Sequence, residues 1–279
     1  MLWDSLSWVA WVALGALAAY LAVALALYAF QRRLIYPASR EAPEAAPLGG
    51  RLPRVLETRA ADGVTCRHWL WLPQAGKPVI CFLQGNAGHM GHRQESHGFL
   101  VEAGYGLLLV GYRGYGGNPG KPDEAGLTAD ARAALAALRE TLPGVPLVLY
   151  GESLGAAVAV ALAAEGETAP LVLDGPFDRL SSPAGHRYRW LPVERLLKDR
   201  WPSVERIGKV RQPLLWLHGS DDPVTPAWSG RRLFEAAPGP KTERVVPGGG
   251  HVDLLEDPET RALLLSWLEA DGAAARPAG

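Results

Sequence analysis

Cysteine is almost absent from this chain. Only Cys66 and Cys81 occur among 279 residues. Two cysteines cannot build the disulfide framework that stabilises many small secreted domains. Cys81 lies inside the apolar run Val79–Leu83, so we expect it to be a small core residue.

An excess of charge of one sign is also missing. The chain carries 28 Lys and Arg against 29 Asp and Glu, which gives a net charge of −1, and the basic residues form no stripe. Proteins that bind nucleic acid by its phosphates need a concentrated positive surface. The sequence therefore argues against a nucleic-acid partner.

Motifs for metals and phosphates are incomplete. His89, His92 and His97 do not have the spacing of a zinc motif. The segment from Gly114 to Lys121 lacks a glycine at the spacing of a phosphate-binding loop, and Pro122 stands where Ser or Thr would bind the metal. We expect neither a metal nor a cofactor.

A long uncharged run is present at the amino terminus, from Ser5 to Gln31. As a helix, Trp8–Phe30 would reach about 34 Å, enough to cross a hydrocarbon core of about 30 Å. A cleaved signal peptide, a buried core helix and an amphipathic surface helix are the alternatives. Signal peptides have a basic start and a shorter apolar run, whereas this one begins with Asp4. We therefore expect an uncleaved transmembrane anchor at 8–30, after a short tail at 1–7.

Basic residues follow this run. Arg32, Arg33 and Arg40 lie in the expected juxtamembrane linker at 31–53, and only the amino-terminal ammonium precedes the span. The positive-inside rule then predicts a single-pass membrane protein whose remaining chain lies on the cytoplasmic side.

The segment Gly151-Glu152-Ser153-Leu154-Gly155 follows an apolar run and precedes an Ala-rich helical stretch. This is the pattern of a nucleophile elbow, a strained strand-to-helix turn that holds a serine hydroxyl at the carboxyl edge of a sheet. The glycines are needed where two backbones approach closely. Ser153 is the candidate nucleophile.

A serine nucleophile needs a base and a group that orients the base. His251 follows three glycines after an expected strand near Lys241–Val246, and Asp222 lies in the loop after the expected strand Leu214–Gly219. The order Ser153, Asp222, His251 is that of α/β-hydrolases. Asp221 and Asp174 are alternative acids, whereas Asp253 is expected to serve its own loop.

Acyl transfer also requires donors for the oxyanion. One is expected to be the backbone N–H of Leu154, directly after the nucleophile. The other is expected from Asn86, in the Gly-rich loop that follows Val79–Leu83.

Strand-like and helix-like segments alternate along the rest of the chain, which predicts an α/β fold with a mostly parallel, doubly wound sheet. We expect the hydrolase domain at 54–270, with a short helical cap near 175–211, and a flexible tail at 271–279. Trp190 and Trp201 in the cap either line an acyl pocket, rest on lipid or pack the insert onto the body.

Several of these segments together carry a resemblance to a known family. The segment Gln84-Gly85-Asn86-Ala87-Gly88 resembles the His-Gly-Asn-Ala-Gly block of one α/β-hydrolase branch, and Tyr112–Gly116, Gly151–Gly155, the His218–Pro226 loop and Gly249–His251 match further blocks in order. That branch holds the membrane-anchored bud-emergence-type hydrolases, related to lysophospholipid lipases and protein depalmitoylases. The similarity runs from about Arg54 to Glu269. Gln84 departs from the usual histidine, and Ala156 from a common glycine.

The resemblance implies a serine hydrolase that cleaves esters or thioesters of small-molecule or lipid-like acyl substrates through an acyl-enzyme, without a cofactor. We expect Gln84, Tyr115 and Trp190 to line the substrate site. A peptidase or amidase on the same fold is the alternative reaction. A catalytically silent, anchored binding protein is the alternative class. The sequence predicts no oligomeric state.

Overall fold

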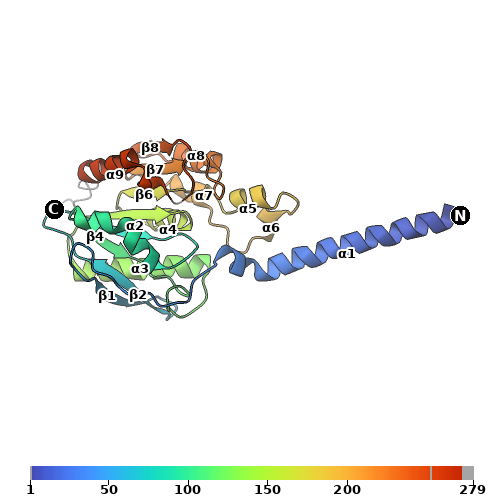
Figure 1. Ribbon diagram of the computed structural model, residues 1–279, viewed down its shortest axis with the longest axis horizontal. Helices are drawn as coiled ribbons and strands as arrows, with labels where there is room; N and C mark the ends of the chain where they lie inside the picture. The colour runs from blue at the N-terminus through green and yellow to red at the C-terminus, as the bar shows by residue number, and fades with distance from the viewer. Residues whose placement is uncertain (1, 252, 272–279) are drawn as a thin grey trace.

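A computed structural model of the chain describes residues 2–251 and 253–271. A rounded α/β body lies at one end, and the long helix α1 projects from it (Figure 1). The expected tail at 271–279 lies, apart from Asp271, outside the described residues.

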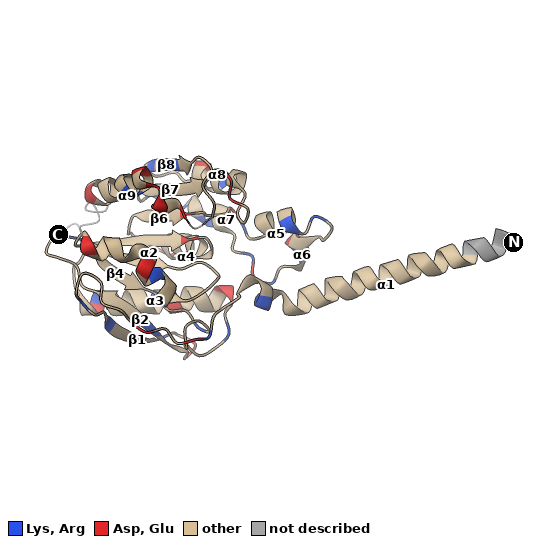
Figure 2. Cartoon of the chain, viewed as in Figure 1, with Lys and Arg blue, Asp and Glu red and all other residues tan. Residues whose placement is uncertain are grey.

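Helix α1 comprises Leu2–Ile35. Its segment Ser7–Ile35 contains an 18-residue window with a mean hydropathy of 2.2, and the segment is long and apolar enough to cross a membrane. Charged side chains of both signs are spread over the body, whereas residues 7–31 of α1 carry no charge (Figure 2). The helix is longer at both ends than the expected span, and its residues 31–35 extend into the body.

An eight-stranded sheet forms the centre of the body, in the order β1-β2-β4-β3-β5-β6-β7-β8. The strands are β1 (Arg54–Arg59), β2 (Thr65–Trp71), β3 (Val79–Leu83), β4 (Gly106–Leu109), β5 (Leu147–Glu152), β6 (Leu171–Asp174), β7 (Leu214–Gly219) and β8 (Lys241–Val246). Strand β2 is antiparallel to both β1 and β4, and all other pairs are parallel. The prediction of a mostly parallel α/β sheet is confirmed.

Helices cover both faces of the sheet. Helices α3 (Glu124–Thr141), α4 (Leu154–Ala164) and α8 (Ala227–Ala236) contribute to the core on one face. Helices α2 (Met90–Glu102) and α9 (Pro258–Ala270), with the short helix η1 (Leu254–Glu256), pack on the other. The side chain of Asp257 caps α9 by accepting from the N–H of Thr260.

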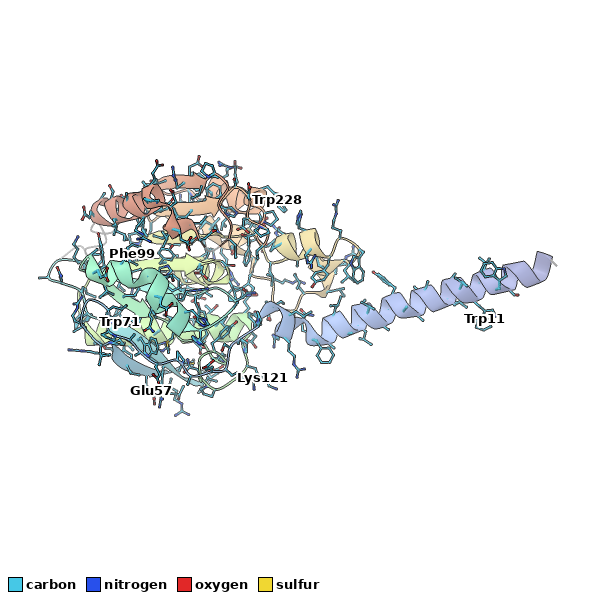
Figure 3. The ribbon with its side chains drawn as sticks, in the orientation of Figure 1. Trp11, Glu57, Trp71, Phe99, Lys121 and Trp228 are labelled. Carbon is cyan, nitrogen blue, oxygen red and sulfur yellow. The ribbon has the colours of Figure 1, made fainter. Side chains whose placement is uncertain are left out.

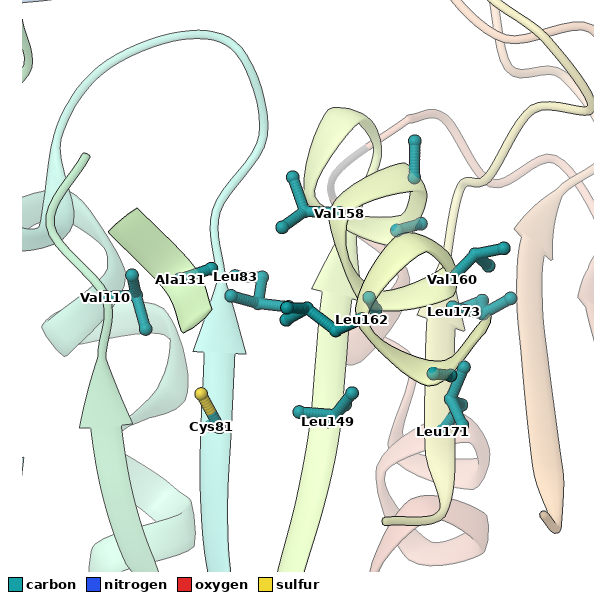
Figure 4. Close-up of a cluster of buried hydrophobic side chains, with 14 of the residues drawn as sticks. Cys81, Leu83, Val110, Ala131, Leu149, Val158, Val160, Leu162, Leu171 and Leu173 are labelled. Carbon is teal, nitrogen blue, oxygen red and sulfur yellow. The ribbon is translucent and has the colours of Figure 1, made fainter. Parts of the chain in front are cut away.

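Alternate residues of each central strand serve the two faces. Cys81 and Leu83 of β3 point toward α4, where they pack with apolar residues such as Leu149 and Leu162 (Figure 4). Phe82 belongs to the opposite cluster. Truncating a side chain at such a site costs about 2–5 kcal/mol, so this packing fixes the position of β5 and of the turn that follows it.

The segment between β6 and β7 forms three short helices, α5 (Ser181–Arg187), α6 (Val193–Leu196) and α7 (Ser203–Ile207). Helices α5 and α6 lie beside the end of α1, whereas α7 lies against the body (Figure 1). Trp201 is buried, and its indole N–H donates to the hydroxyl of Tyr36. Of the alternatives for Trp201, packing onto the body is the one observed.

The segment after α1 is packed onto the body. Tyr36 is buried, and Ala38 forms a parallel bridge with Gly88. Residues that we expected to form a linker therefore lie against the loop that carries Asn86.

Candidate active site

Ser153 lies in the turn between β5 and α4. Its φ of 52° and ψ of −112° are strained for a residue with a side chain. Glycine is required on both sides: a Cβ on Gly155 would lie 1.8 Å from the carbonyl oxygen of Leu83, and one on Gly151 would lie 2.5 Å from that of Gly155. The close backbone approach therefore holds the serine in this conformation.

The imidazole of His251 joins Ser153 to Asp222. Its Nε2 lies 2.8 Å from the Oγ of Ser153, and its Nδ1 lies 2.7 Å from an Oδ of Asp222. A glycine at the end of β7 makes this possible, because a Cβ on Gly219 would lie 2.1 Å from the carbonyl oxygen of Gly250. The three side chains form one hydrogen-bonded chain across the carboxyl edge of the sheet.

The carboxylate of Asp222 is buried and fully hydrogen-bonded. One oxygen accepts from the backbone N–H groups of Val224 and Thr225, both at 2.8 Å, and the other accepts from the Thr225 hydroxyl at 2.6 Å. Burial raises the pKa of this carboxyl, but the bonds from His251 and Thr225 outweigh burial and hold the pKa below its usual value. Asp222 is therefore charged beside the imidazole.

The alternative acids have other partners. Asp174 accepts from the Tyr150 hydroxyl at 2.7 Å, Asp221 from the Ser220 hydroxyl and Asp253 from the N–H of Gly250. Burial raises the pKa of Asp174 to about 7; the Tyr150 hydrogen bond lowers it and the charge of Glu152 raises it. Among these four carboxylates, Asp222 is the one that contacts His251.

Asn86 and Leu154 lie on the two sides of the elbow. Leu154 is the first residue of α4, where backbone N–H groups have no partner within the helix. The carbonyl of Asn86 accepts from the Tyr115 hydroxyl at 2.8 Å. Its carboxamide donates to the carbonyl of Ile35 at 2.8 Å. These two bonds hold Asn86 against Tyr115 and against the end of α1.

The chain has relatives of known family. Residues 74–205 match a hydrolase family described as serine aminopeptidase, S33. An uncharacterized protein of Mycobacterium tuberculosis is 43% identical over 83% of this chain and 84% of its own length. The protein bem46 of Schizosaccharomyces pombe is 32% identical over 72% of each chain. The chain belongs to the bem46 family of α/β-hydrolases.

More distant relatives agree with this assignment. The lysophosphatidylserine lipase ABHD12 of Danio rerio is 33% identical over 59% of this chain and 48% of its own. An esterase of Pyrococcus furiosus has the same fold, with a TM-score of 0.68 at 19% identity, over 83% of this chain and 98% of the esterase. The expected resemblance to the bud-emergence-type hydrolases is confirmed, and the chain is a hydrolase by family.

The three residues expected to line the substrate site differ in their surroundings. Gln84 is 1% exposed, and neither polar atom of its side chain has a hydrogen-bond partner among the described residues. Tyr115 is buried, and its hydroxyl donates a hydrogen bond to the backbone carbonyl of Asn86. Trp190 is 50% exposed and lies edge-on to Tyr20 of α1, with ring centroids 5.8 Å apart.

Sequence reasoning missed a buried ion pair beside the site. Glu152, the residue before Ser153, accepts from Arg93 of α2 at 2.7 Å and from the backbone N–H of Gly85 at 3.3 Å. The carboxylate thus ties the elbow to the loop of Asn86. Two features of the sequence could have indicated this pair: Glu152 is an acidic residue inside the elbow, and Arg93 is a basic residue at the end of the Gly-rich block.

Proposed function

We propose that this hydrolase is a membrane-anchored serine hydrolase that cleaves carboxylic ester or thioester bonds of lipid-like acyl substrates through an acyl-enzyme. The observation that carries the proposal is the chain of hydrogen bonds from Ser153 through His251 to Asp222, at 2.8 and 2.7 Å. A hydroxyl in contact with an imidazole, itself oriented by a charged carboxylate, is the arrangement that activates a serine.

The chemistry follows from these positions. The Oγ of Ser153 attacks the substrate carbonyl while its proton passes to the Nε2 of His251, and the charge of Asp222 stabilises the imidazolium. The backbone N–H groups of Asn86 and Leu154 would hold the oxyanion, each contributing about 3–4 kcal/mol to stabilising the transition state.

The tetrahedral intermediate collapses by breaking the carbonyl bond to the leaving oxygen or sulfur. His251 returns its proton to that leaving alcohol or thiol. Water then attacks the acyl-serine, with His251 accepting one proton of the water and passing it to the Oγ of Ser153. The products are a carboxylic acid and the alcohol or thiol, and no cofactor takes part.

Membrane attachment is part of the proposal. Helix α1 supports a single transmembrane anchor, and Arg32, Arg33 and Arg40 support a cytoplasmic position for the hydrolase domain. Both native cysteines are buried. A Lys121→Cys variant, at an exposed position on the body (Figure 3), should react with an impermeant maleimide only after cells are permeabilised. Reaction in intact cells would reverse the orientation.

The test of the reaction is labelling of the full-length protein by a fluorophosphonate probe. We expect wild type and Ser220→Ala, an exposed serine, to be labelled, and Ser153→Ala and His251→Ala to be unlabelled while remaining folded. A folded wild type that resists the probe would favour a silent binding protein. Matched ester, thioester and aminoacyl-amide substrates then separate the proposed reaction from a peptidase, the alternative favoured by the family description.

A further inference from the structure

A groove runs between α1 and the cap. Its lining is almost wholly apolar and includes Ala24, Leu27 and Tyr28 of α1 with Ala184, Leu191 and Val193 of the cap. Figure 1 shows α5 and α6 beside the last turns of α1 before it enters the body. The groove therefore lies where a membrane-spanning segment meets the hydrolase domain.

One face of α1 is shaped for this contact. The groove residues Ala24, Leu27, Gln31 and Leu34 recur at the spacing of a single helical face. Of residues 7–30, Ala24 and Leu27 alone are partly buried, and all others are exposed. The rest of the helix surface remains for lipid, so the open side of the groove would face the hydrocarbon of the bilayer.

Polar contacts at the body end hold the two walls in place. The Gln31 side chain donates to the carbonyl of Leu196 at 3.1 Å and accepts from the N–H of Lys198 at 2.7 Å. Arg32 forms a two-pronged ion pair with Asp199, both bonds being 2.9 Å. Asp199 is buried, and an Arg–carboxylate fork has a defined geometry. These bonds fix α1 and the cap relative to each other, so the groove between them has a defined width.

One residue of the groove contacts the candidate oxyanion loop. Ile35 lines the groove, and its carbonyl accepts the 2.8 Å bond from the carboxamide of Asn86. In the proposed reaction, Asn86 also offers its backbone N–H to the reacting carbonyl. One hydrogen bond therefore joins the groove to the loop that carries Asn86.

We propose that this groove binds the acyl chain of a lipid substrate and guides its ester from the bilayer to Ser153. The proposal rests on the proposed hydrolase function. An unbranched acyl chain matches an apolar groove that opens toward hydrocarbon. The cap beside it is basic, with Arg187, Arg189 and Lys198, which suits an anionic headgroup at the membrane surface.

The experiment uses the full-length protein in phosphatidylcholine vesicles and compares two substitutions on one helix. Leu27→Trp fills the groove, whereas Leu25→Trp places the same side chain on the exposed face, where Leu25 is 67% exposed. The measured quantity is the ratio of kcat/KM for a palmitate ester to that for an acetate ester. We expect Leu27→Trp to lower this ratio roughly tenfold and Leu25→Trp to leave it unchanged.

An unchanged ratio in Leu27→Trp would overturn the proposal. Ala184→Leu narrows the same groove from the cap side and keeps the test available if Leu27→Trp does not fold. A wild type that hydrolyses neither ester and resists the fluorophosphonate probe would instead defeat the proposed function.

A second readout is independent of turnover. In Ser153→Ala, a palmitoyl lipid carrying a diazirine at the chain end should crosslink to residues 184–197 in preference to the exposed face of α1. Equal labelling of both faces would mean that the groove holds bulk lipid only, and would also overturn the proposal.

Discussion

The carboxamide of Asn86 donates a 2.8 Å hydrogen bond to the backbone carbonyl of Ile35, the last residue of α1. Two residues 51 positions apart thus join the apolar helix to the loop at the candidate active site. The bridge between Ala38 and Gly88 reinforces this contact. The end of α1 is therefore part of the scaffold that positions the loop.

Removing this bond should slow the chemical step. Asn86→Ala keeps the backbone N–H that would hold the oxyanion but loses its anchor, and a net hydrogen bond is worth about 1 kcal/mol. We expect kcat to fall roughly five- to tenfold with a small change in KM. Steady-state kinetics on a soluble ester measure this. An unchanged kcat would show that the loop holds its position without α1.

Replacing Asp222 should remove most of the activity. Asp222→Asn keeps the size of the side chain but loses the charge that stabilises the imidazolium and fixes its tautomer. We expect kcat to fall by about 10³–10⁴, with the fold retained. Asp221→Asn, one residue away and exposed, is the matched control and should remain within about twofold of wild type. Equal losses in both variants would argue against Asp222 as the orienting acid.

Replacing Asp174 should change the stability of the fold and leave catalysis largely unchanged. Its pKa of about 7 lies above the value of about 4 for an unfolded aspartate, so the folded protein binds this proton more tightly. The stabilisation is complete below about pH 4 and is lost as the pH rises through about 7. Asp174→Asn should therefore raise the melting temperature at pH 8 and change it little at pH 4. A gap of the same size at both pH values would contradict this assignment.

The pair of Arg93 and Glu152 should matter both for folding and for rate. Arg93→Met leaves the carboxylate of Glu152, 5% exposed, without its partner, at an expected cost of about 2–3 kcal/mol. The elbow and the Asn86 loop would also lose the ion pair that connects them. We therefore expect kcat to fall even when it is measured below the melting temperature, where the variant is folded. Adding Glu152→Gln should recover part of the stability.

The control for this pair is Arg132→Met, which breaks an exposed ion pair with Glu165. We expect it to change stability by less than about 1 kcal/mol. Chemical denaturation of the three variants and wild type checks both statements. A double variant no more stable than Arg93→Met would count against a coupled pair.

Much of the fold could be predicted because its signals are local. Apolar runs bounded by turn residues placed β3 and β7 at the observed boundaries, and the strand expected near Lys241–Val246 coincides with β8. The elbow glycines specify a close backbone approach that few other patterns require. Loops that follow parallel strands meet at one edge, which is why the separated Ser153, Asp222 and His251 could be expected to lie together.

The contacts that sequence reasoning missed depend on side-chain reach across the fold. Nothing local in Gln31, Arg32 or Tyr36 indicates that they contact the cap, since a polar residue after an apolar run usually faces water. Trp190 was expected at the substrate site because it lies in the cap, and its contact with Tyr20 of α1 had no signal in the sequence. Gln84 was expected at the substrate site because it belongs to the loop of Asn86. Its side chain is 1% exposed and is therefore packed inside the body.

The ion pair between Arg32 and Asp199 also limits which substrates are within reach. A flexible connection of about 20 residues would let a domain range some 25 Å from its anchor, but here the connecting residues are held against the body. With α1 in a bilayer, the catalytic serine would stay at one height and one orientation above it. Such an enzyme acts in cis: it would meet molecules diffusing within its own leaflet, and could not reach across to an apposed membrane.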